Sequence, residues 1–187
     1  FSDLAGYSTV AEQLEPSEVV AMLNEYIGAM NAVIATYRGC VIEFFGDGIL
    51  AAFGAPEPLE HHADAAIECA RAMQAALELL NDRWVETGRA ARWLRAGHGR
   101  LKCRIGVHTG KVIAGNMGSD LRMKYAVIGD AVNVASRLET LNKELGTSIA
   151  VSDATRQRLS TSVAQSLIFR GAHPIKGRQG QIEVYEG

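Results

Sequence analysis

The sequence predicts an α/β protein whose helices pack on a mixed sheet, and three observations support this class. Apolar residues recur at helical spacing over residues 16–37, and a second long segment is rich in Ala and Leu. Several shorter segments are rich in β-branched and aromatic residues, as strands are. Helical and strand segments alternate, but some strands follow one another directly, which excludes a purely parallel sheet.

The first half of the chain contains two predicted helices and a hairpin. Pro16 occupies the first turn of the first helix, where proline is tolerated. The segment CVIEFFGDGILAAFGAP (40–56) predicts two strands joined by a tight GDG turn. A second helix is predicted over residues 63–84. Residues 86–102 contain several Arg and Gly, and we expect an exposed excursion whose basic side chains face water.

The second half adds strands, one long helix and a small one. LKCRIGVHTGKVIAGNMG (101–118) predicts two strands with a turn at His108, Thr109 and Gly110. YAVIGDAVNVASRLETLNKELG (125–146) predicts a short strand, a Gly-Asp bend and a third helix. Further short strands are predicted at SIAVS, SLIFRG and QIEVYEG, with a small helix near residues 153–159.

Length and composition are those of a single domain, residues 1–187. Hydrophobic content of 48% and charged content of 21% are ordinary for a globular protein, and a net charge of -2 argues against a general nucleic-acid partner. The three cysteines show no metal-ligand spacing and fit a reducing compartment. No apolar run approaches the roughly 20 residues of a spanning helix, so we expect a cytoplasmic domain without membrane contact. Because residue 1 already lies inside a motif, we expect that the N-terminal edge has been truncated.

Two aspartates follow apolar runs at small-residue bends, Asp3 in FSDLAGYS and Asp47 in EFFGDG. Mg²⁺ and Mn²⁺ prefer hard oxygen ligands, and two carboxylates on neighbouring strand ends can hold two such ions against a triphosphate. The small residues after Asp3 would let backbone amides approach phosphate oxygens, and a following helix start would add positive partial charge. A lone Gly-Asp is commonly only a turn, so this interpretation requires the two strands to be neighbours.

FSDLAGYS, EFFGDGILAAFG, RIGVHTGKVIAGNMG and YAVIGDAVNVASRLE occur in the order found in class III nucleotidyl cyclase catalytic domains, and the chain resembles that family. The four motifs span residues 1–139, and IKG near the C terminus extends the match to nearly the whole chain. The resemblance implies a mixed, largely antiparallel sheet with a ferredoxin-like βαββαβ core and helices packed on it. It also implies that Asp3 and Asp47 bind two divalent cations, Mg²⁺ or Mn²⁺, with the Leu4 carbonyl as a further ligand.

Asn133 and Arg137 lie four residues apart, on one face of the third predicted helix. Such residues are usually the wet side of an amphipathic helix. Arginine, however, suits a reacting phosphate because its fork matches phosphate oxygens and it stays charged. The resemblance implies that Asn133 orients the ribose and that Arg137 stabilises the α-phosphate. We also expect phosphate contacts from the loop after Asp3 and from two basic residues: Gly6, Tyr7, Ser8, Lys176 and Arg122.

Two positions select the purine in the family, and they correspond here to Glu43 and Ala126. Adenylyl cyclases commonly have Lys at the first and Asp or Thr at the second, whereas guanylyl cyclases have Glu and then Cys or another small residue. Glu43 matches the guanine pattern, and Ala126 matches neither fully. A carboxylate can accept from guanine N1–H and N2 together, whereas adenine N1 offers it only a lone pair. We expect GTP as substrate, with ATP as the alternative.

In the family, the metal aspartates face base-selecting and transition-state residues of the opposite subunit. Because one chain carries both sets here, the resemblance implies a head-to-tail homodimer with two equivalent shared sites that convert the triphosphate to a cyclic nucleotide and pyrophosphate. The general base stays open between Asp3 and a substrate phosphate. A domain that binds nucleotide without chemistry is a second reading, and a cyclic-dinucleotide enzyme is disfavoured because the hairpin reads FFGDGI rather than GGDEF.

Overall fold

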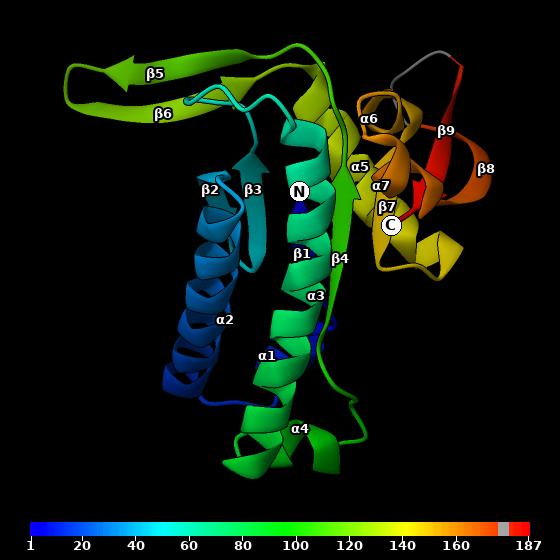
Figure 1. The fold of residues 1–187 in the computed structure, drawn as a ribbon. Helices are drawn as coiled ribbons and strands as arrows, with labels where there is room; N and C mark the ends of the chain where they lie inside the picture. The colour runs from blue at the N-terminus through cyan, green and yellow to red at the C-terminus, as the bar shows by residue number, and fades with distance from the viewer. Residues whose placement is uncertain (176–179) are drawn as a thin grey trace.

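The computed structural model describes residues 1–175 and 180–187 (Figure 1). Within these residues seven strands form one sheet in the order β2-β3-β1-β4-β7-β9-β8, and two more strands form a separate arm. Among the described strands only β4 and β7 pair in parallel, so the sheet is mixed and largely antiparallel, as predicted. The strands are β1 (Ser2–Ala5), β2 (Cys40–Phe45), β3 (Gly48–Ala52), β4 (Lys102–Val107), β5 (Ile113–Ser119), β6 (Arg122–Ile128), β7 (Ile149–Ser152), β8 (Ile168–Pro174) and β9 (Gln181–Glu186).

Helices cover both faces of the sheet. The long helices α2 and α3 stand side by side on one face, and α5 packs on the other (Figure 1). Short helices join the longer elements. The helices are α1 (Tyr7–Ala11), α2 (Pro16–Thr36), α3 (His62–Glu86), α4 (Ala91–Arg95), α5 (Asp130–Leu145), α6 (Asp153–Arg156) and α7 (Thr161–Gln165).

Alternation along β4 decides which side chains reach which face. Cys103 and Ile105 are buried in the core that α2 and α3 form with the sheet, where the Tyr26 hydroxyl contacts Cys103 Sγ at 3.6 Å. Successive side chains of a strand point to opposite faces. Arg104 and Gly106 therefore lie on the face that carries α5.

Helix α5 approaches β4 more closely than any side chain on Gly106 would allow. A Cβ atom there would lie 2.1 Å from the Ala135 carbonyl oxygen and 2.4 Å from the Glu139 nitrogen. One turn further along, Asn142 Nδ2 donates to the Ile105 carbonyl at 3.0 Å. These contacts fix the height and the rotation of α5 above the sheet.

The two long helices and the hairpin confirm the sequence predictions within a few residues, but two expectations were wrong: that residues 86–102 are exposed, and that no apolar segment is long enough to span a membrane. Residues 86–102 are not a fully exposed excursion, because they include α4 and its buried Trp93, which meets Trp84 edge to face. The two strands predicted within residues 101–118 are present as β4 and β5, and they belong to different sheets: β4 pairs with β1 and β7, and β5 pairs with β6. Helix α2 has the length and composition of a membrane span, with a mean hydropathy of 1.3, although one side of it is buried in the protein core.

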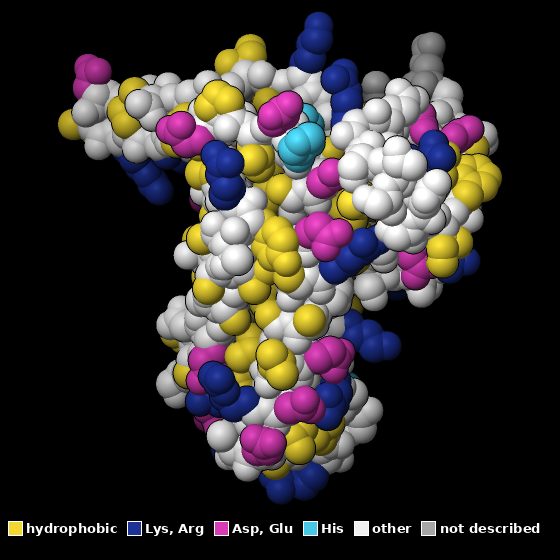
Figure 2. Space-filling model, in the orientation of Figure 1, with side chains coloured by type: hydrophobic (Ala, Val, Ile, Leu, Met, Phe, Trp, Pro, Cys, Tyr) yellow, Lys and Arg dark blue, Asp and Glu magenta, His cyan; other side chains and the backbone are white. Residues whose placement is uncertain are grey.

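The arm formed by β5 and β6 projects from one end of the sheet, beside β2 and β3 (Figure 1). It is paired from Ile113 opposite Ile128 to Ser119 opposite Arg122. Hydrophobic side chains lie exposed along it (Figure 2). The most exposed is Leu121 at 98%, followed by Ile113 at 70% and Met123 at 60%. Within the described part of the chain the arm contacts β2 through the ion pair of Lys124 with Glu43, and its apolar side chains Ile113, Met123 and Ile128 stay more than half exposed.

Candidate active site

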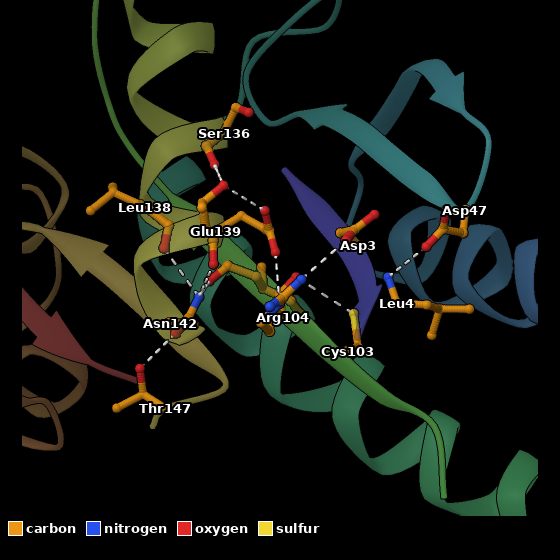
Figure 3. A network of polar contacts seen from close by, with 12 residues as sticks. Asp3, Leu4, Asp47, Cys103, Arg104, Ser136, Leu138, Glu139, Asn142 and Thr147 are labelled. Atoms are coloured by element: carbon orange, nitrogen blue, oxygen red, sulfur yellow. Dashed lines mark hydrogen bonds and ion pairs between the residues drawn. The ribbon is translucent and has the colours of Figure 1, made fainter. Parts of the chain in front are cut away.

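Asp3 and Asp47 lie on neighbouring strands, which is the arrangement that a shared ligand requires. Asp3 is on β1, which pairs with β3, and Asp47 is in the tight turn before β3. The Leu4 amide donates to Asp47 Oδ2 at 3.1 Å and holds the turn against β1 (Figure 3). Burial, followed by the charge of Asp3, raises the pKa of Asp47 to about 6.

The paired carboxylates fit divalent cations. The raised pKa means that ionising Asp47 beside the charged Asp3 is unfavourable in the folded chain. A bound cation would offset the two negative charges. No cluster of three or more His, Cys, Asp and Glu occurs among the residues that the structure describes. Further ligands would therefore be backbone carbonyls such as that of Leu4, water and substrate phosphates, as is usual for Mg²⁺.

The loop after Asp3 lies beside the same carboxylates. Gly6 adopts a φ of +84°, which glycine tolerates, and turns the chain from β1 into α1. Burial and then the charge of Asp47 raise the pKa of Tyr7. Gly6 and Ser8 are exposed. Helix α1 has only five residues, so the partial charge expected from a helix start is small.

Arg104 and Glu139 join this site, and neither was singled out from the sequence. Arg104 is directly opposite Asp3 in the pairing of β1 with β4, and its Nη2 lies 3.3 Å from Asp3 Oδ2. Its Nε lies 2.9 Å from Glu139 Oε1 on α5 (Figure 3). The alternation of β4 could have placed Arg104 on this face, but the strand pairing that sets it opposite Asp3 is not visible in the sequence.

The two residues predicted to select the base, Glu43 and Ala126, lie on β2 and on the neighbouring strand β6 of the arm. The Glu43 carboxylate on β2 forms an ion pair with the Lys124 ammonium on β6. The hydrogen bond and charge of Lys124 lower the pKa of Glu43, so this carboxylate is ionised at neutral pH. Ala126 is two residues from Lys124 and therefore shares its face of β6. Lys124 was not identified from the sequence, because nothing local links β6 to β2.

Asn133 and Arg137 share one face of α5 but turn away from Asp3. Glu139 marks the side of α5 that faces Asp3 through Arg104. Arg137 precedes Glu139 by two residues, which is about 200° around a helix. Asn133 is exposed and Arg137 is half-buried. In the described part of the chain neither forms a side-chain hydrogen bond or ion pair, so both are available to a ligand.

The structure says less about Arg122 and Lys176, the two basic residues that were predicted to contact phosphate. Arg122 begins β6 in the exposed arm, and its charge acts on Glu43. Lys176 lies outside the described residues. A cavity of about 770 Å³ lies near the starts of α3 and α5 and the end of β4, and neither aspartate nor the Asn133–Arg137 pair lines it. Asp3, Asp47 and Arg137 are half-buried outside this cavity, and Asn133 is exposed.

The fold and the paired aspartates define the chain as a class III nucleotide cyclase catalytic domain. The family described as the adenylate and guanylate cyclase catalytic domain matches residues 1–186. The chain belongs to this family.

Adenylyl cyclases and a guanylyl cyclase are among the proteins that the chain resembles. The chain is 37% identical to Adenylate cyclase 1 of Rhizobium meliloti (strain 1021), over 100% of this chain and 26% of that protein. It therefore spans about a quarter of that relative's length. The structure matches the guanylyl cyclase Cya2 with a TM-score of 0.83 at 34% identity, over 99% of this chain and 87% of the other. It matches the adenylyl cyclase CyaB from P. aeruginosa with a TM-score of 0.81 at 29% identity, over 99% and 89%.

Proposed function

We propose that the chain converts GTP to cyclic GMP and pyrophosphate in a homodimer with two equivalent sites, each shared between the chains. The observation that carries the proposal is the separation of the site residues within one chain. Asp3, with Asp47 beside it, is linked through Arg104 to Glu139 on one side of α5, and Arg137 is on the opposite side of that helix. A second copy is therefore needed to bring a transition-state arginine to the paired carboxylates.

The arm supplies a reason for two chains to associate. Its exposed apolar side chains, Ile113, Met123 and Ile128 among them, are more than half exposed in the single chain. Contiguous exposed apolar surface is typical of protein interfaces. A two-fold arrangement would cover these residues and would use the same surface of each chain, giving two identical sites.

The chemistry assigned to this site is an intramolecular displacement. The ribose 3′ oxygen attacks the α-phosphorus, the bond to the bridging oxygen breaks, and pyrophosphate leaves. Two divalent cations, when bound by Asp3 and Asp47, would neutralise the triphosphate and acidify the 3′ hydroxyl. Arg137 of one chain would stabilise charge on the α-phosphate, and Asn133 would orient the ribose. The 3′ proton passes either to Asp3 or to a substrate phosphate.

Glu43 supports GTP as the substrate. Its pKa is lowered by Lys124, so it meets the base as a carboxylate. Guanine presents N1–H and N2–H side by side, and each carboxylate oxygen has two lone pairs, so Oε2 can accept from Lys124 and from the base. Ala126 offers no side-chain hydrogen bond, so we expect selectivity below the roughly 10⁴-fold of a fully hydrogen-bonded site.

ATP is the second candidate, and one observation favours it. The Lys124 ammonium lies against Glu43, where it could donate to the unprotonated N1 of adenine. Adenine would then be read by Lys124, with Glu43 holding the ammonium in place. The relatives named above include both adenylate and guanylate cyclases.

The test is to incubate the purified chain with Mn²⁺ and equal GTP and ATP, and to identify the cyclic product by mass spectrometry. Predominant cyclic GMP is the expected result, and an Arg137→Ala chain is the control for contaminating cyclases. Predominant cyclic AMP would assign base reading to Lys124. A confirmed dimer that binds nucleotide and forms neither product would refute catalysis and leave a nucleotide-binding module.

A further inference from the structure

A buried carboxylate on α5 lies close to the metal aspartates without belonging to them. Glu139 has a side chain only 7% exposed, and its charged neighbour is Arg104. Burying a carboxylate is costly unless it is paired. Burial raises the pKa of Glu139, although the charge of the Arg104 guanidinium beside it acts in the opposite direction. The three residues Asp3, Arg104 and Glu139 form a row that we call the carboxylate bridge (Figure 3).

The guanidinium in the carboxylate bridge is shared between two anions and satisfies neither fully. Its contact with Asp3 is long, 3.3 Å, and involves only Oδ2. Its Nε lies 2.9 Å from Glu139 Oε1, yet neither atom has an aligned hydrogen bond among the described residues. Glu139 Oε2 is already occupied, since it accepts from the Thr140 hydroxyl at 3.1 Å. A small rotation of Arg104 would strengthen one contact and weaken the other.

We infer that Glu139 is a positioning residue for metal binding: it draws the Arg104 guanidinium away from Asp3 and leaves that carboxylate able to take a divalent cation. This inference rests on the proposed function. A cation at Asp3 and the Arg104 guanidinium compete for the same negative charge. With a cation bound at Asp3, Arg104 would turn toward Glu139, whose buried Oε1 lies 2.9 Å from Nε without an aligned hydrogen bond among the described residues. Without Glu139, Arg104 would pair with Asp3 alone and oppose the metal.

The position of Glu139 is set by the backbone and not by its own side chain. Gly106 lets α5 descend onto β4 until the Glu139 nitrogen is within 2.4 Å of the place a Cβ would take, and Asn142 ties the next turn to Ile105. Replacing the Glu139 side chain therefore leaves these two contacts of α5 in place. The change in charge can then be separated from a displaced helix.

The test compares metal binding by the wild-type chain and by Glu139→Gln, which keeps the shape and removes the charge. Mn²⁺ is titrated in the presence of 3′-deoxy-GTP, which cannot cyclise, and free Mn²⁺ is read by electron paramagnetic resonance. We expect Glu139→Gln to need roughly 5- to 20-fold more Mn²⁺ for half-saturation, the lower part of the range of typical coupling between two sites. Glu139→Asp, which keeps the charge on a shorter stem, should lie between. Glu144→Gln, an exposed change on the same helix, should bind as the wild type does.

The outcomes separate this inference from the proposed function. If Glu139→Gln melts at a lower temperature but binds Mn²⁺ as the wild type does, Glu139 is only structural and the inference fails. If Glu139→Gln does not fold, an Mn²⁺ affinity of Glu139→Asp equal to that of the wild type would overturn it. A wild-type chain that binds Mn²⁺ with 3′-deoxy-GTP but cyclises neither GTP nor ATP would refute the proposed function alone.

Discussion

The Leu4 amide donates a 3.1 Å hydrogen bond to Asp47 Oδ2, and this bond holds the hairpin tip against the strand that carries Asp3. Two carboxyl groups are thereby fixed together in the chain before any ion arrives. The arrangement has a cost, because burial and the charge of Asp3 raise the pKa of Asp47 to about 6. Part of the folding free energy is thus given up to preorganise a cation site.

The first prediction is that Asp47→Asn stabilises the metal-free chain while abolishing activity. A group whose pKa rises from 3.8 to about 6 on folding stabilises the fold below pH 4, and this contribution is lost as the pH rises through 6. The substituted amide would keep the Leu4 hydrogen bond through its carbonyl oxygen, without the charge. Allowing for solvent screening, we expect the free energy of unfolding of Asp47→Asn to exceed that of the wild type by roughly 1–2 kcal/mol at pH 7. Thermal unfolding between pH 4 and 8 measures it.

Asp120→Asn, an exposed change in the arm, is the control and should leave the unfolding temperature unchanged. The gain from Asp47→Asn should shrink toward pH 4, where Asp47 is protonated. Adding Mn²⁺ should raise the unfolding temperature of the wild-type chain and not that of Asp47→Asn. A variant that unfolds at a lower temperature than the wild type at pH 7 would contradict the argument.

The second prediction concerns how Lys124 affects substrate choice. Lys124→Gln removes the ion pair with Glu43, so the pKa of Glu43 should return toward its ordinary value. If guanine is read by Glu43, we expect kcat/KM for GTP to fall roughly 3- to 10-fold, as when one exposed charged contact is lost. If adenine is read by Lys124, the activity with ATP should fall by much more. Lys143→Gln, an exposed change on α5, is the matched control.

The sequence predicted the parts of this site that depend on local patterns. Asp3 and Asp47 were singled out because their motifs resemble those of the family, although Asp3 lies within β1 and not at a strand end, and α5 was found from its periodicity. Residues joined across the fold were not found: Arg104 meets Asp3 only through the pairing of β1 with β4, and Lys124 meets Glu43 only because the arm lies beside β2. Helix α4 was missed since a single turn is too short to show a helical period.

The third prediction tests the close approach of α5 to β4. Gly106→Ala would place a methyl group 2.1 Å from the Ala135 carbonyl oxygen, so α5 must move. We expect a loss of roughly 3 kcal/mol or more in the free energy of unfolding. Gly28→Ala is the matched control, because Gly28 is exposed on α2 with open space around it. That change should stabilise the chain by roughly 0.5–1 kcal/mol. Urea unfolding of both variants decides the matter, and equal stability would refute the packing argument.

The fourth prediction is that the arm holds two chains together. Ile113 is 70% exposed, so Ile113→Glu should scarcely change the stability of a single chain. In a dimer the new carboxylate would be buried against a partner without a counter-charge. We expect sedimentation velocity to show a shift from dimer to monomer, with activity recovering as the protein concentration is raised. A variant that remains dimeric and active at low concentration would place the interface elsewhere.

The last prediction follows from the opposite orientations of Arg137 and Glu139 on α5. If each site takes its carboxylates from one chain and its arginine from the other, Asp47→Ala and Arg137→Ala chains should each be inactive and should rescue each other when mixed. Random pairing makes half the dimers mixed, and each mixed dimer has one intact site, so recovery should reach about a quarter of the wild-type rate. A chain carrying both substitutions should rescue neither single variant. Mixed dimers confirmed by mass spectrometry but lacking activity would mean that the groups act within one chain, and α5 would then have to rotate by about half a turn on β4.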